Sequence, residues 1–516
     1  MTQKYIEKIL SARVYDVAIE SPLEPARRLS VRLDNQILLK REDLQPVFSF
    51  KLRGAYNKLY QLNRKSELKG VVAASAGNHA QGLALAAREL GVKATIVMPK
   101  TTPKIKVDSV RSYGAKAVLI GDTYDEASEY AHELCDKEGL AYIHPYDDPD
   151  VIAGQGTVAV EILRQYTDDI DAIFVPVGGG GLIAGMATFI KYLRPEVKVI
   201  GVEAADSACF AAALAKKRRV ILGQVGLFAD GVAVKQMGRE TWRVARQVVD
   251  EVITVSTDEI CAAIKDIFDD TRSITEPAGA LAVAGIKKYV EENKASKQTL
   301  IAINSGANMN FDRLRHVSER AELGEHREGL IGVTIPEEPG SFLKFCRIIG
   351  KKGITEFNYR YSDSSTAHVF AGIQLADGLP ELDELVKKLT DKNYPVLSMS
   401  DNEMAKLHVR HMVGGHANKI ENEVLYRFQF PERPGALLDF LAHIGKRWNI
   451  SLFHYRNHGA AFGRVLVGLQ VERSERKDIK PYLDELGYNW WNESQNEAYK
   501  MFLGSPEDET KSKAKV

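Results

Sequence analysis

The sequence has no excess of charge of either sign. Lysine plus arginine total 69 and aspartate plus glutamate total 69, so the formal net charge at pH 7 is zero. A balanced chain has no bulk electrostatic field that would attract nucleic acid or an anionic membrane surface. We therefore expect neither nucleic acid nor a membrane as a partner, and we expect small neutral or zwitterionic ligands instead.

Cysteine is also scarce. Its four copies are far apart and form no CxxC pair: Cys135, Cys209, Cys261 and Cys346. Such spacing argues against a disulfide framework and against a structural zinc site. We therefore expect a reducing compartment and no bound metal.

Long apolar runs are missing as well. A helix that crosses a bilayer needs about 18 consecutive apolar residues, and the sequence contains no such run. The N-terminal residues MTQKYIEKIL carry charges where a signal peptide needs an apolar stretch. The sequence therefore predicts a soluble, cytoplasmic protein.

The apolar runs that are present are short and alternate with longer helical patterns up to about residue 320. Examples are GVVAASA, KATIVMP, AIFVPVGGGG, KVIGVEA and TLIAINSG. This alternation is typical of βα units in a parallel sheet, whose ligands bind at the carboxyl ends of the strands. A chain of 516 residues has room for about three to four domains. We predict that residues 1–320 form an α/β domain.

The rest of the sequence contains an internal repeat. It follows the charged stretch SERAELGEHREG, which we interpret as a linker. GVTIPEEPGSFLKF, beginning at residue 332, resembles RFQFPERPGALLDF, beginning at residue 427. The period is about 95 residues, which is too long for a solenoid. We predict two copies of one small α+β domain, at residues 329–400 and 423–500.

Two glycine-containing turns follow apolar strands and precede helices. VGGGGLIAG at 177–185 frees backbone N–H groups to converge on an anion, but it lacks the lysine and hydroxyl of a P-loop. SAGNHAQG at 75–82 forms a second such nest, with Asn78 and His79 beside it. A flexible linker and a packed core histidine are the alternative interpretations.

Lys51, in the stretch SFKLRGA, is the candidate reactive amine. Near a helix N-terminus and partly removed from water, a lysine has a lowered pKa and is more often neutral, the form that attacks aldehydes. Most lysines on a helix face are only solvated charges. Two anion sites around one lysine, however, indicate a phosphorylated cofactor and a carboxylate substrate.

Five motifs make a family resemblance specific. In order along the first 320 residues they are SFKLRGAYNKL, SAGNHAQG, GGGGLIAG, EPAGA and NSGANMNFDRLR. They resemble the pyridoxal-phosphate enzymes of the tryptophan-synthase-β type (fold type II), and among these the biosynthetic threonine deaminases. The repeats resemble the two ACT-like regulatory domains of that family. The resemblance implies a lyase that uses pyridoxal 5'-phosphate to convert L-threonine to 2-oxobutanoate and ammonia in isoleucine biosynthesis.

The resemblance also implies roles for individual residues. Lys51 matches the catalytic Schiff-base lysine, and Phe50 matches the residue that lies against the pyridine ring. Asn78 matches the partner of the phenolic oxygen, and Ser305 the partner of the pyridine nitrogen. The expected phosphate cup comprises Gly178, Gly179, Gly180, Gly181 and Leu182, and the expected substrate-carboxylate site comprises Ser75, Ala76, Gly77, Asn78 and His79. Asn304 departs from the family, in which leucine is more common.

The chemistry follows from two of these placements. A serine hydroxyl at the pyridine nitrogen cannot supply a full proton, and the weaker electron sink favours β-elimination over transamination. At the position corresponding to Ala76, the related serine racemase carries an acid/base serine. We therefore expect little racemisation.

Two alternatives remain open. A serine-preferring dehydratase or another β-replacement enzyme, such as threonine synthase, is close because serine and threonine differ by one methyl group, worth about 1–3 kcal/mol in a pocket. A non-catalytic amino-acid sensor would keep the fold without the reaction. The sensor hypothesis predicts a damaged cofactor site, whereas Lys51, Asn78 and Ser305 are all present.

For the repeats, the resemblance implies isoleucine as an inhibitor and valine as its antagonist. Tyr359 and Tyr455 are the candidate effector-site residues, although both are equally compatible with core aromatics. The resemblance also implies a homotetramer.

Overall fold

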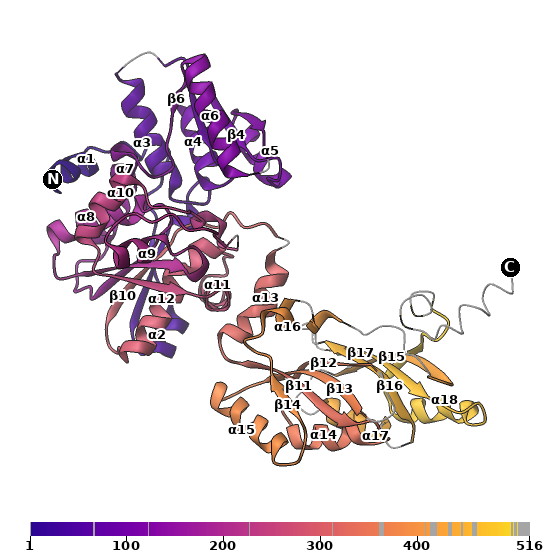
Figure 1. The fold of residues 1–516 in the computed structure, drawn as a ribbon. Coiled ribbons are helices and arrows are strands. Elements are labelled where there is room, and N and C mark those ends of the chain that lie inside the picture. Colours follow the sequence, from indigo (N-terminus) through magenta and orange to yellow (C-terminus); the bar gives the residue numbers. More distant parts are fainter. Residues whose placement is uncertain are drawn as a thin grey trace, which may run out of the picture. The chain divides into compact units, whose positions relative to one another are not determined.

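The structure, a computed structural model, describes residues 2–65, 68–121, 123–226, 228–311, 313–360, 366–407, 409–412, 420–431, 436–444, 447–456, 462–496, 499 and 503. The chain divides into two compact units, residues 1–324 and residues 325–516 (Figure 1). Among the described residues, no helix combines the length and the apolar character needed to cross a membrane.

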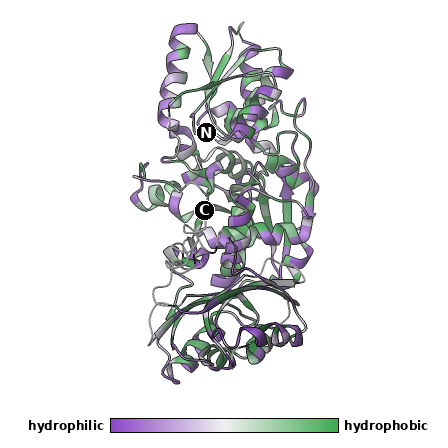
Figure 2. Ribbon diagram, turned by 90° about the vertical axis from the view of Figure 1, so that its right-hand side faces the viewer, coloured by the Kyte–Doolittle hydropathy of each residue, from purple (hydrophilic) through white to green (hydrophobic). Residues whose placement is uncertain are grey.

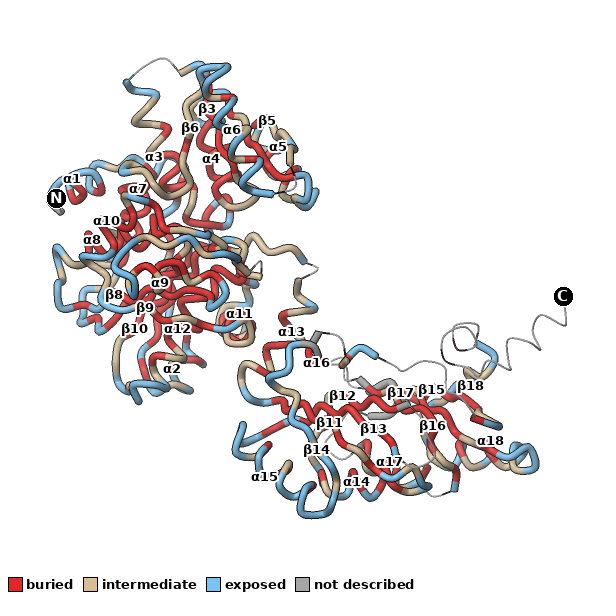
Figure 3. The backbone as a smooth tube through the Cα atoms, in the orientation of Figure 1, coloured by how far each residue is buried: buried red, intermediate tan, exposed pale blue. Residues whose placement is uncertain are grey.

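The first unit contains a six-stranded sheet of order β1-β2-β10-β7-β8-β9. β1 is antiparallel to β2, and all other neighbours are parallel. Its inner strands are buried (Figure 3). Their continuous apolar runs suit a sheet that is covered on both faces. The strands are β1 (Leu23–Pro25), β2 (Gln36–Arg41), β7 (Ala172–Pro176), β8 (Lys198–Ala204), β9 (Glu251–Val255) and β10 (Thr299–Asn304).

A second, four-stranded sheet of the same unit has the order β5-β4-β3-β6, and all its neighbours are parallel. Its strands are β3 (Val71–Ala74), β4 (Ala94–Met98), β5 (Lys116–Leu119) and β6 (Ala141–Tyr142). The helices around it are α3 (Lys51–Asn63), α4 (Asn78–Glu89), α5 (Lys104–Ser112) and α6 (Tyr124–Glu138). The two sheets, one parallel and one parallel except for β1, and their crossover helices confirm the predicted α/β architecture.

The first unit contains further helices, some of which pack on the six-stranded sheet and others on neighbouring helices. They are α1 (Thr2–Leu10), α2 (Arg27–Leu33), α7 (Pro149–Gln165), α8 (Gly181–Leu193), α9 (Cys209–Lys216), α10 (Arg239–Val248), α11 (Thr257–Thr271), α12 (Pro277–Asn293) and α13 (Arg313–Gly324). The short 3-10 helices are η1 (Glu42–Leu44), η2 (Ala205–Ser207) and η3 (Asp230–Val232).

The stretch SERAELGEHREG joins the two units, as the linker interpretation predicts, but only three of its residues lie outside helices and strands. Most of this stretch belongs to α13, and β11 follows after three residues. Val317 and Ala321, one helical turn apart, are buried in the first unit's core. Arg320 Nε donates to Asp258 Oδ1 of α11 at 2.5 Å. The many charged residues obscure the helical pattern in the sequence, but a narrow apolar stripe packs this helix against α11.

The second unit contains one eight-stranded sheet of order β14-β11-β13-β12-β16-β17-β15-β18. Each repeat contributes four strands and two helices in the order βαββαβ. The first comprises β11 (Glu328–Pro336), α14 (Ser341–Ile349), β12 (Ile354–Arg360), β13 (Thr366–Gln374), α15 (Leu379–Thr390) and β14 (Val396–Ser398). The second comprises β15 (Glu423–Pro431), α17 (Ala436–Ile444), β16 (Asn449–Arg456), β17 (Phe462–Gln470), α18 (Arg476–Glu485) and β18 (Asn489–Asn492). The segments α16 (Glu403–Leu407) and η4 (Val409–His411) lie between the repeats in sequence.

The two repeats also make equivalent contacts within the sheet. The strands β12 and β16, the second strand of each repeat, pair antiparallel at the middle of the sheet. The Thr355 hydroxyl donates to Glu328 in the first repeat, and the Ser451 hydroxyl donates to Glu423 at the equivalent place in the second. Figure 2 shows strands of the sheets coloured mainly as hydrophobic. The two α+β copies predicted from the internal repeat are confirmed, and they share one sheet.

Candidate active site

Lys51 is the first residue of α3. Phe50 occupies the N-cap position without a side-chain cap, and Ser49 does not take that place. The Lys51 Nζ lies 5.2 Å from the centroid of the Phe50 ring and donates to the carbonyl oxygen of Pro145 at 3.4 Å. Burial lowers the pKa of Lys51 to about 8, although the negative charge of Glu276 opposes this shift. A substantial share of the amine is therefore neutral at mildly alkaline pH.

The glycine loop between β7 and α8 forms a cradle. Gly180 has φ +91°, a left-handed conformation that disfavours side chains, and a Cβ there would lie 2.5 Å from Met237 Cε. A Cβ at Gly179 would lie 2.3 Å from the ring of Tyr146. Because side chains are excluded from the loop, the first N–H groups of α8 remain available to an anion.

The turn between β3 and α4 forms another wall. Ser75 Oγ accepts a hydrogen bond from the Gly77 N–H at 3.3 Å, and a Cβ at Gly77 would meet nothing within 4 Å. His79 Nε2 lies 2.9 Å from the Ile143 carbonyl oxygen, and burial lowers the pKa of His79 to about 3. The His79 ring is therefore a neutral, packed group. What this turn offers an anion is the set of N–H groups that begins α4.

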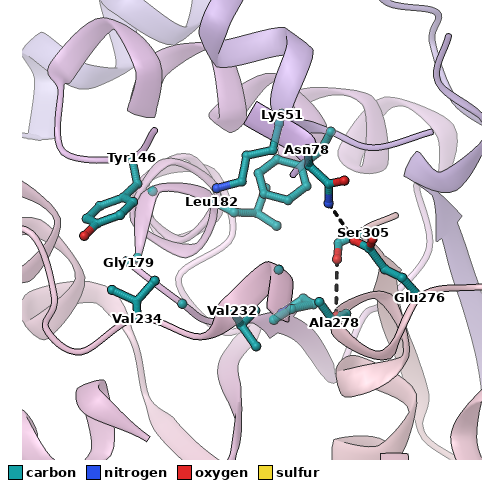
Figure 4. Close-up of a pocket in the computed structure, with 16 residues that line it drawn as sticks. Lys51, Asn78, Tyr146, Gly179, Leu182, Val232, Val234, Glu276, Ala278 and Ser305 are labelled. Atoms are coloured by element: carbon teal, nitrogen blue, oxygen red, sulfur yellow. Dashed lines mark hydrogen bonds between the residues drawn. The ribbon is translucent and has the colours of Figure 1, made fainter. Parts of the chain in front are cut away.

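These segments meet in one pocket, shown in Figure 4, where the Lys51 side chain points toward Tyr146. All the cofactor residues expected from the sequence line it: Phe50, Lys51, Asn78, Gly178, Gly179, Gly180, Gly181, Leu182 and Ser305. Of the expected carboxylate-site residues, Asn78 lines the pocket, while Ser75, Ala76, Gly77 and His79 do not.

The end of β10 supplies the serine. Ser305 is buried, and its Oγ donates to the Ala278 carbonyl oxygen, in the first turn of α12, at 3.4 Å. The neighbouring Asn304 Oδ1 lies 2.6 Å from Thr275 Oγ1. The residue that departs from the family pattern therefore ties the end of β10 to the segment before α12.

Of the pocket residues that the sequence reasoning missed, two have polar side chains. Tyr146 follows β6 and packs over the glycine loop. Glu276, in the EPAGA motif, accepts a hydrogen bond from Asn78 Nδ2 at 2.6 Å, and burial raises its pKa to about 7. Glu276 did have a sequence signal, since EPAGA is one of the family motifs, but no role was assigned to its carboxylate, whereas Tyr146 gives no signal.

The donor set fits pyridoxal 5'-phosphate. A partly neutral lysine suits an aldehyde, and a side-chain-free cradle at a helix N-terminus suits a phosphate. The Ser305 hydroxyl and the Asn78 amide suit a ring nitrogen and a phenolic oxygen. Among the described residues, no group of three or more His, Cys, Asp and Glu side chains is arranged to hold a metal ion.

Comparisons with known proteins agree with this chemistry. The sequence pattern of the family described as "Pyridoxal-phosphate dependent enzyme" matches residues 14–306. The fold and the pocket thus define a pyridoxal-phosphate-dependent enzyme of the tryptophan-synthase-β type. The pattern described as "C-terminal regulatory domain of Threonine dehydratase" matches residues 319–409 and 414–503.

Individual relatives are more specific. The L-threonine dehydratase biosynthetic IlvA of Burkholderia multivorans is 53% identical over 502 residues, which is 97% of this chain and 99% of the relative. The protein of that name from Escherichia coli is 53% identical over 500 residues, 97% of each chain. The structure of the processed form of threonine deaminase isoform 2 from Solanum lycopersicum is 52% identical and covers 62% of this chain and 93% of its own, with a TM-score of 0.61. This chain belongs to the family of biosynthetic threonine dehydratases.

The two tyrosines expected at effector sites lie in the second unit, in the adjacent strands β12 and β16. Tyr359 and Tyr455 are both buried in the hydrophobic core of that unit. The Tyr359 ring packs edge-on against Phe342, with centroids 4.7 Å apart, and its hydroxyl donates to Glu337. Tyr455 lies opposite Phe357 across the strand pair. Both residues are core aromatics in this structure, and their part in effector binding stays a prediction.

Proposed function

We propose that this protein is a threonine ammonia-lyase, which converts L-threonine to 2-oxobutanoate and ammonia as a step of isoleucine biosynthesis. The observation that carries the proposal is the convergence of Lys51, Asn78, the glycine loop and Ser305 on one pocket. The chain around this pocket is 53% identical to biosynthetic threonine dehydratases over 97% of its length.

Pyridoxal phosphate, when bound, supplies an electron sink for the substrate Cα, a weak one beside a serine hydroxyl, which suits β-elimination. Lys51 would hold its aldehyde carbon, and the Lys51 amine, once the substrate amine has replaced it there, would take the Cα proton of the substrate. Phe50 would lie against the cofactor ring, and Asn78 and Ser305 would bind its phenolic oxygen and ring nitrogen. The N–H groups of the glycine loop, from Gly178 to Leu182, would hold its phosphate.

The substrate carboxylate is assigned to the turn before α4. The N-terminus of α4 would supply backbone N–H groups to that carboxylate, and the neutral His79 ring contributes no charge there. Ala76 has no proton to give, so product forms with little racemisation. L-serine is the alternative substrate, since it lacks only the methyl group of L-threonine.

Regulation is assigned to the repeats. Residues 329–400 and 423–500 act as ACT-like domains that bind isoleucine as an inhibitor and valine as its antagonist, with Tyr359 and Tyr455 near the effector sites. Residues 1–320 act as the catalytic domain. The protein works in the cytoplasm as a homotetramer. Support for the regulatory role of the repeats comes from the match to the C-terminal regulatory domain of threonine dehydratase.

The test is the initial rate of 2-oxoacid formation from L-threonine, titrated with L-isoleucine. We expect turnover that isoleucine suppresses and that valine restores. The matched control is Lys51→Ala, which removes the amine and should abolish both turnover and the visible absorption of bound cofactor.

Other results would change the assignment in defined ways. Turnover that is indifferent to isoleucine keeps the catalytic role and removes the effector. Bound cofactor without threonine turnover would redirect the assignment to L-serine or phosphohomoserine, and failure with these substrates would leave an amino-acid sensor.

A further inference from the structure

Glu276 is a pocket residue to which the roles above assign nothing. It is only 3% exposed, although a carboxylate is seldom so deeply buried without a purpose. It occupies the N-cap position of α12 in an extended conformation, yet its side chain does not cap the helix. Instead the carboxylate lies at the pocket, where Asn78 Nδ2 donates to its Oε1 at 2.6 Å (Figure 4).

The backbone around Glu276 is fixed on both sides. Its N–H donates to the Gly306 carbonyl oxygen at 3.1 Å, and Thr275 Oγ1 lies 2.7 Å from the same oxygen. A Cβ at Gly306 would lie 2.6 Å from Glu276 Oε1, so the carboxylate fills space that only glycine leaves open. The start of α12 and the residues after β10 thus fix the position of the Glu276 side chain.

The Glu276 carboxylate and the Asn308 amide together fix the orientation of the Asn78 amide. Asn308 Nδ2 donates to the Val47 carbonyl oxygen at 2.8 Å and to Asn78 Oδ1 at 2.7 Å. Asn78 Oδ1 is therefore an acceptor, and Asn78 Nδ2 must face Glu276 as a donor. An amide nitrogen carries two hydrogens, so the second remains for a group in the pocket.

Charges on several elements face Glu276. Burial raises its pKa to about 7, and the negative charge of Asp230 in η3 acts in the same direction. The hydrogen bond from Asn78 and the positive charge of Lys106 in α5 act against it. Asp230 is itself bonded to Lys106 Nζ at 2.7 Å and to Arg313 Nη1 at 3.2 Å. On the pocket side, Glu276 favours the protonated form of Lys51.

We propose that Glu276 is a positioning residue of this site, whose carboxylate orients the Asn78 amide and holds titratable negative charge against the Lys51 amine. The proposal rests on the proposed function for its effect on turnover, but its effect on Lys51 is independent of any substrate. Ionised Glu276 stabilises the Lys51 ammonium, and protonated Glu276 does not. The protein therefore sets the proton affinity of its reactive amine with a second buried group.

The first experiment uses the protein stripped of cofactor. Pyridoxal phosphate is added at a series of pH values, and the growth of visible absorption measures the reaction of the Lys51 amine. In the native sequence the rate should rise with pH through about 8, as the ammonium loses its proton. In Glu276→Gln the midpoint should move to lower pH, because a neutral amide no longer stabilises the ammonium.

The reloaded enzyme supplies a second readout. Glu276→Gln should lower kcat for L-threonine by about tenfold or more, as expected for loss of a charge-assisted hydrogen bond, with a smaller change in KM. In the same variant, the part of the fall of kcat/KM toward acid pH that depends on Glu276 should disappear. A merely structural role would lower activity at all pH values alike.

Glu203→Gln is the matched control. Glu203 is also fully buried, and burial raises its pKa to about 7. Its carboxylate accepts from the N–H groups of Phe210 and Ala211, each at 2.8 Å, and it does not line the pocket. This control should leave the pH midpoint of cofactor uptake unchanged.

The proposal would be overturned if the pH midpoint of cofactor uptake were the same in Glu276→Gln as in the native protein. It would also be overturned if Glu203→Gln shifted this midpoint by the same amount.

Should Glu276→Gln fail to fold, Asn78→Ala tests the same contact. Loss of the Asn78 hydrogen bond raises the pKa of Glu276, so the acid limb of kcat/KM should move to higher pH, and an unmoved limb would contradict the proposal. A native protein without threonine turnover would refute the proposed function and leave the uptake measurement intact.

Discussion

The reactivity of Lys51 depends on neighbours that come from distant parts of the chain. Burial lowers its pKa, and the charge of Glu276, 225 residues later in the sequence, moderates the effect. The position of Lys51 at a helix start was readable from SFKLRGA, but the depth of burial was not. A helix N-terminus is a local property, whereas desolvation depends on every segment that closes over the amine.

Arg53, two residues after Lys51, lies in a buried charge network. Its Nε donates to Glu42 Oε2 at 2.8 Å and its Nη1 to Glu161 Oε1 at 2.6 Å, while Lys40 Nζ lies 2.7 Å from Glu161 Oε2. Replacing Arg53 with methionine leaves two carboxylates with one cation. We expect the free energy of unfolding of the first unit to fall by about 3–5 kcal/mol. Urea unfolding followed by the absorption of bound cofactor measures this unit alone.

An exposed ion pair provides the control for that measurement. Lys137 Nζ lies 3.2 Å from Glu133 Oε2 on the surface of α6. Lys137→Met should change the free energy of unfolding by less than about 1 kcal/mol. If Arg53→Met were no more sensitive to urea than this control, the buried network would have no stabilising role.

Four helices begin at or beside the pocket, and this arrangement of elements suits it to anions. α3 starts at Lys51, α4 at Asn78, α8 at Gly181 and α12 at Pro277. Helix N-termini carry partial positive charge and unsatisfied N–H groups, so their convergence favours a phosphate and a carboxylate in one cavity. The starts of α4 and α8 were visible in the sequence as glycine-containing turns after apolar strands, whereas α3 and α12 follow other helical segments.

The glycine loop before α8 gives a prediction at this scale. Gly180→Ala places a side chain at φ +91°, where its Cβ would lie 2.5 Å from Met237 Cε. The loop must shift, and the N–H groups that hold the phosphate shift with it. We expect the dissociation constant of pyridoxal phosphate to rise by about tenfold or more, equivalent to ~1.4 kcal/mol. Titration of the cofactor-free protein with pyridoxal phosphate measures it.

Gly114→Ala is the control, because it places a side chain at a similar positive φ but lies outside the pocket. Gly114 has φ +86°, and a Cβ there would meet nothing within 4 Å. Stability should fall by about 1 kcal/mol while the affinity for cofactor stays the same. Equal cofactor affinities of the two variants would show that the loop does not form the phosphate site.

At the scale of the whole molecule, the chain divides into two units that each bury a core of their own. The first core surrounds parallel strands and the second lies on one face of the antiparallel sheet. Because these cores are separate, the first unit contains the complete pocket within residues 1–324.

We therefore predict that a chain ending at residue 324 still turns over L-threonine and no longer responds to L-isoleucine. The assay is the initial rate of 2-oxoacid formation with and without isoleucine. The full-length protein at the same concentration is the reference. Inhibition of the shortened chain by isoleucine would place the effector site in the first unit and contradict the regulatory role of the repeats.

The limits of sequence reasoning follow the same division between local and distant interactions. The turns at Asn78 and Gly178–Gly181 could be assigned because each is a short stretch with its own backbone signal, whereas the role of Ser305 came from the family resemblance. Most of SERAELGEHREG, expected to be a linker, is helical, since a few buried apolar residues outweighed its many charges. The EPAGA motif was recognised, but no role could be given to Glu276, because its partners come from distant parts of the chain.

The sequence by itself determined the βα alternation, the internal repeat and the motifs of a pyridoxal-phosphate enzyme, because these depend on residue order over short spans. Only the tertiary structure decided that the two repeats share one eight-stranded sheet through β12 and β16. It alone brought Glu276 to Asn78 and Lys51, and buried the His79 ring as a neutral group. Pairing between distant strands and removal of side chains from water are properties of the packed chain, and no short stretch of residues carries them.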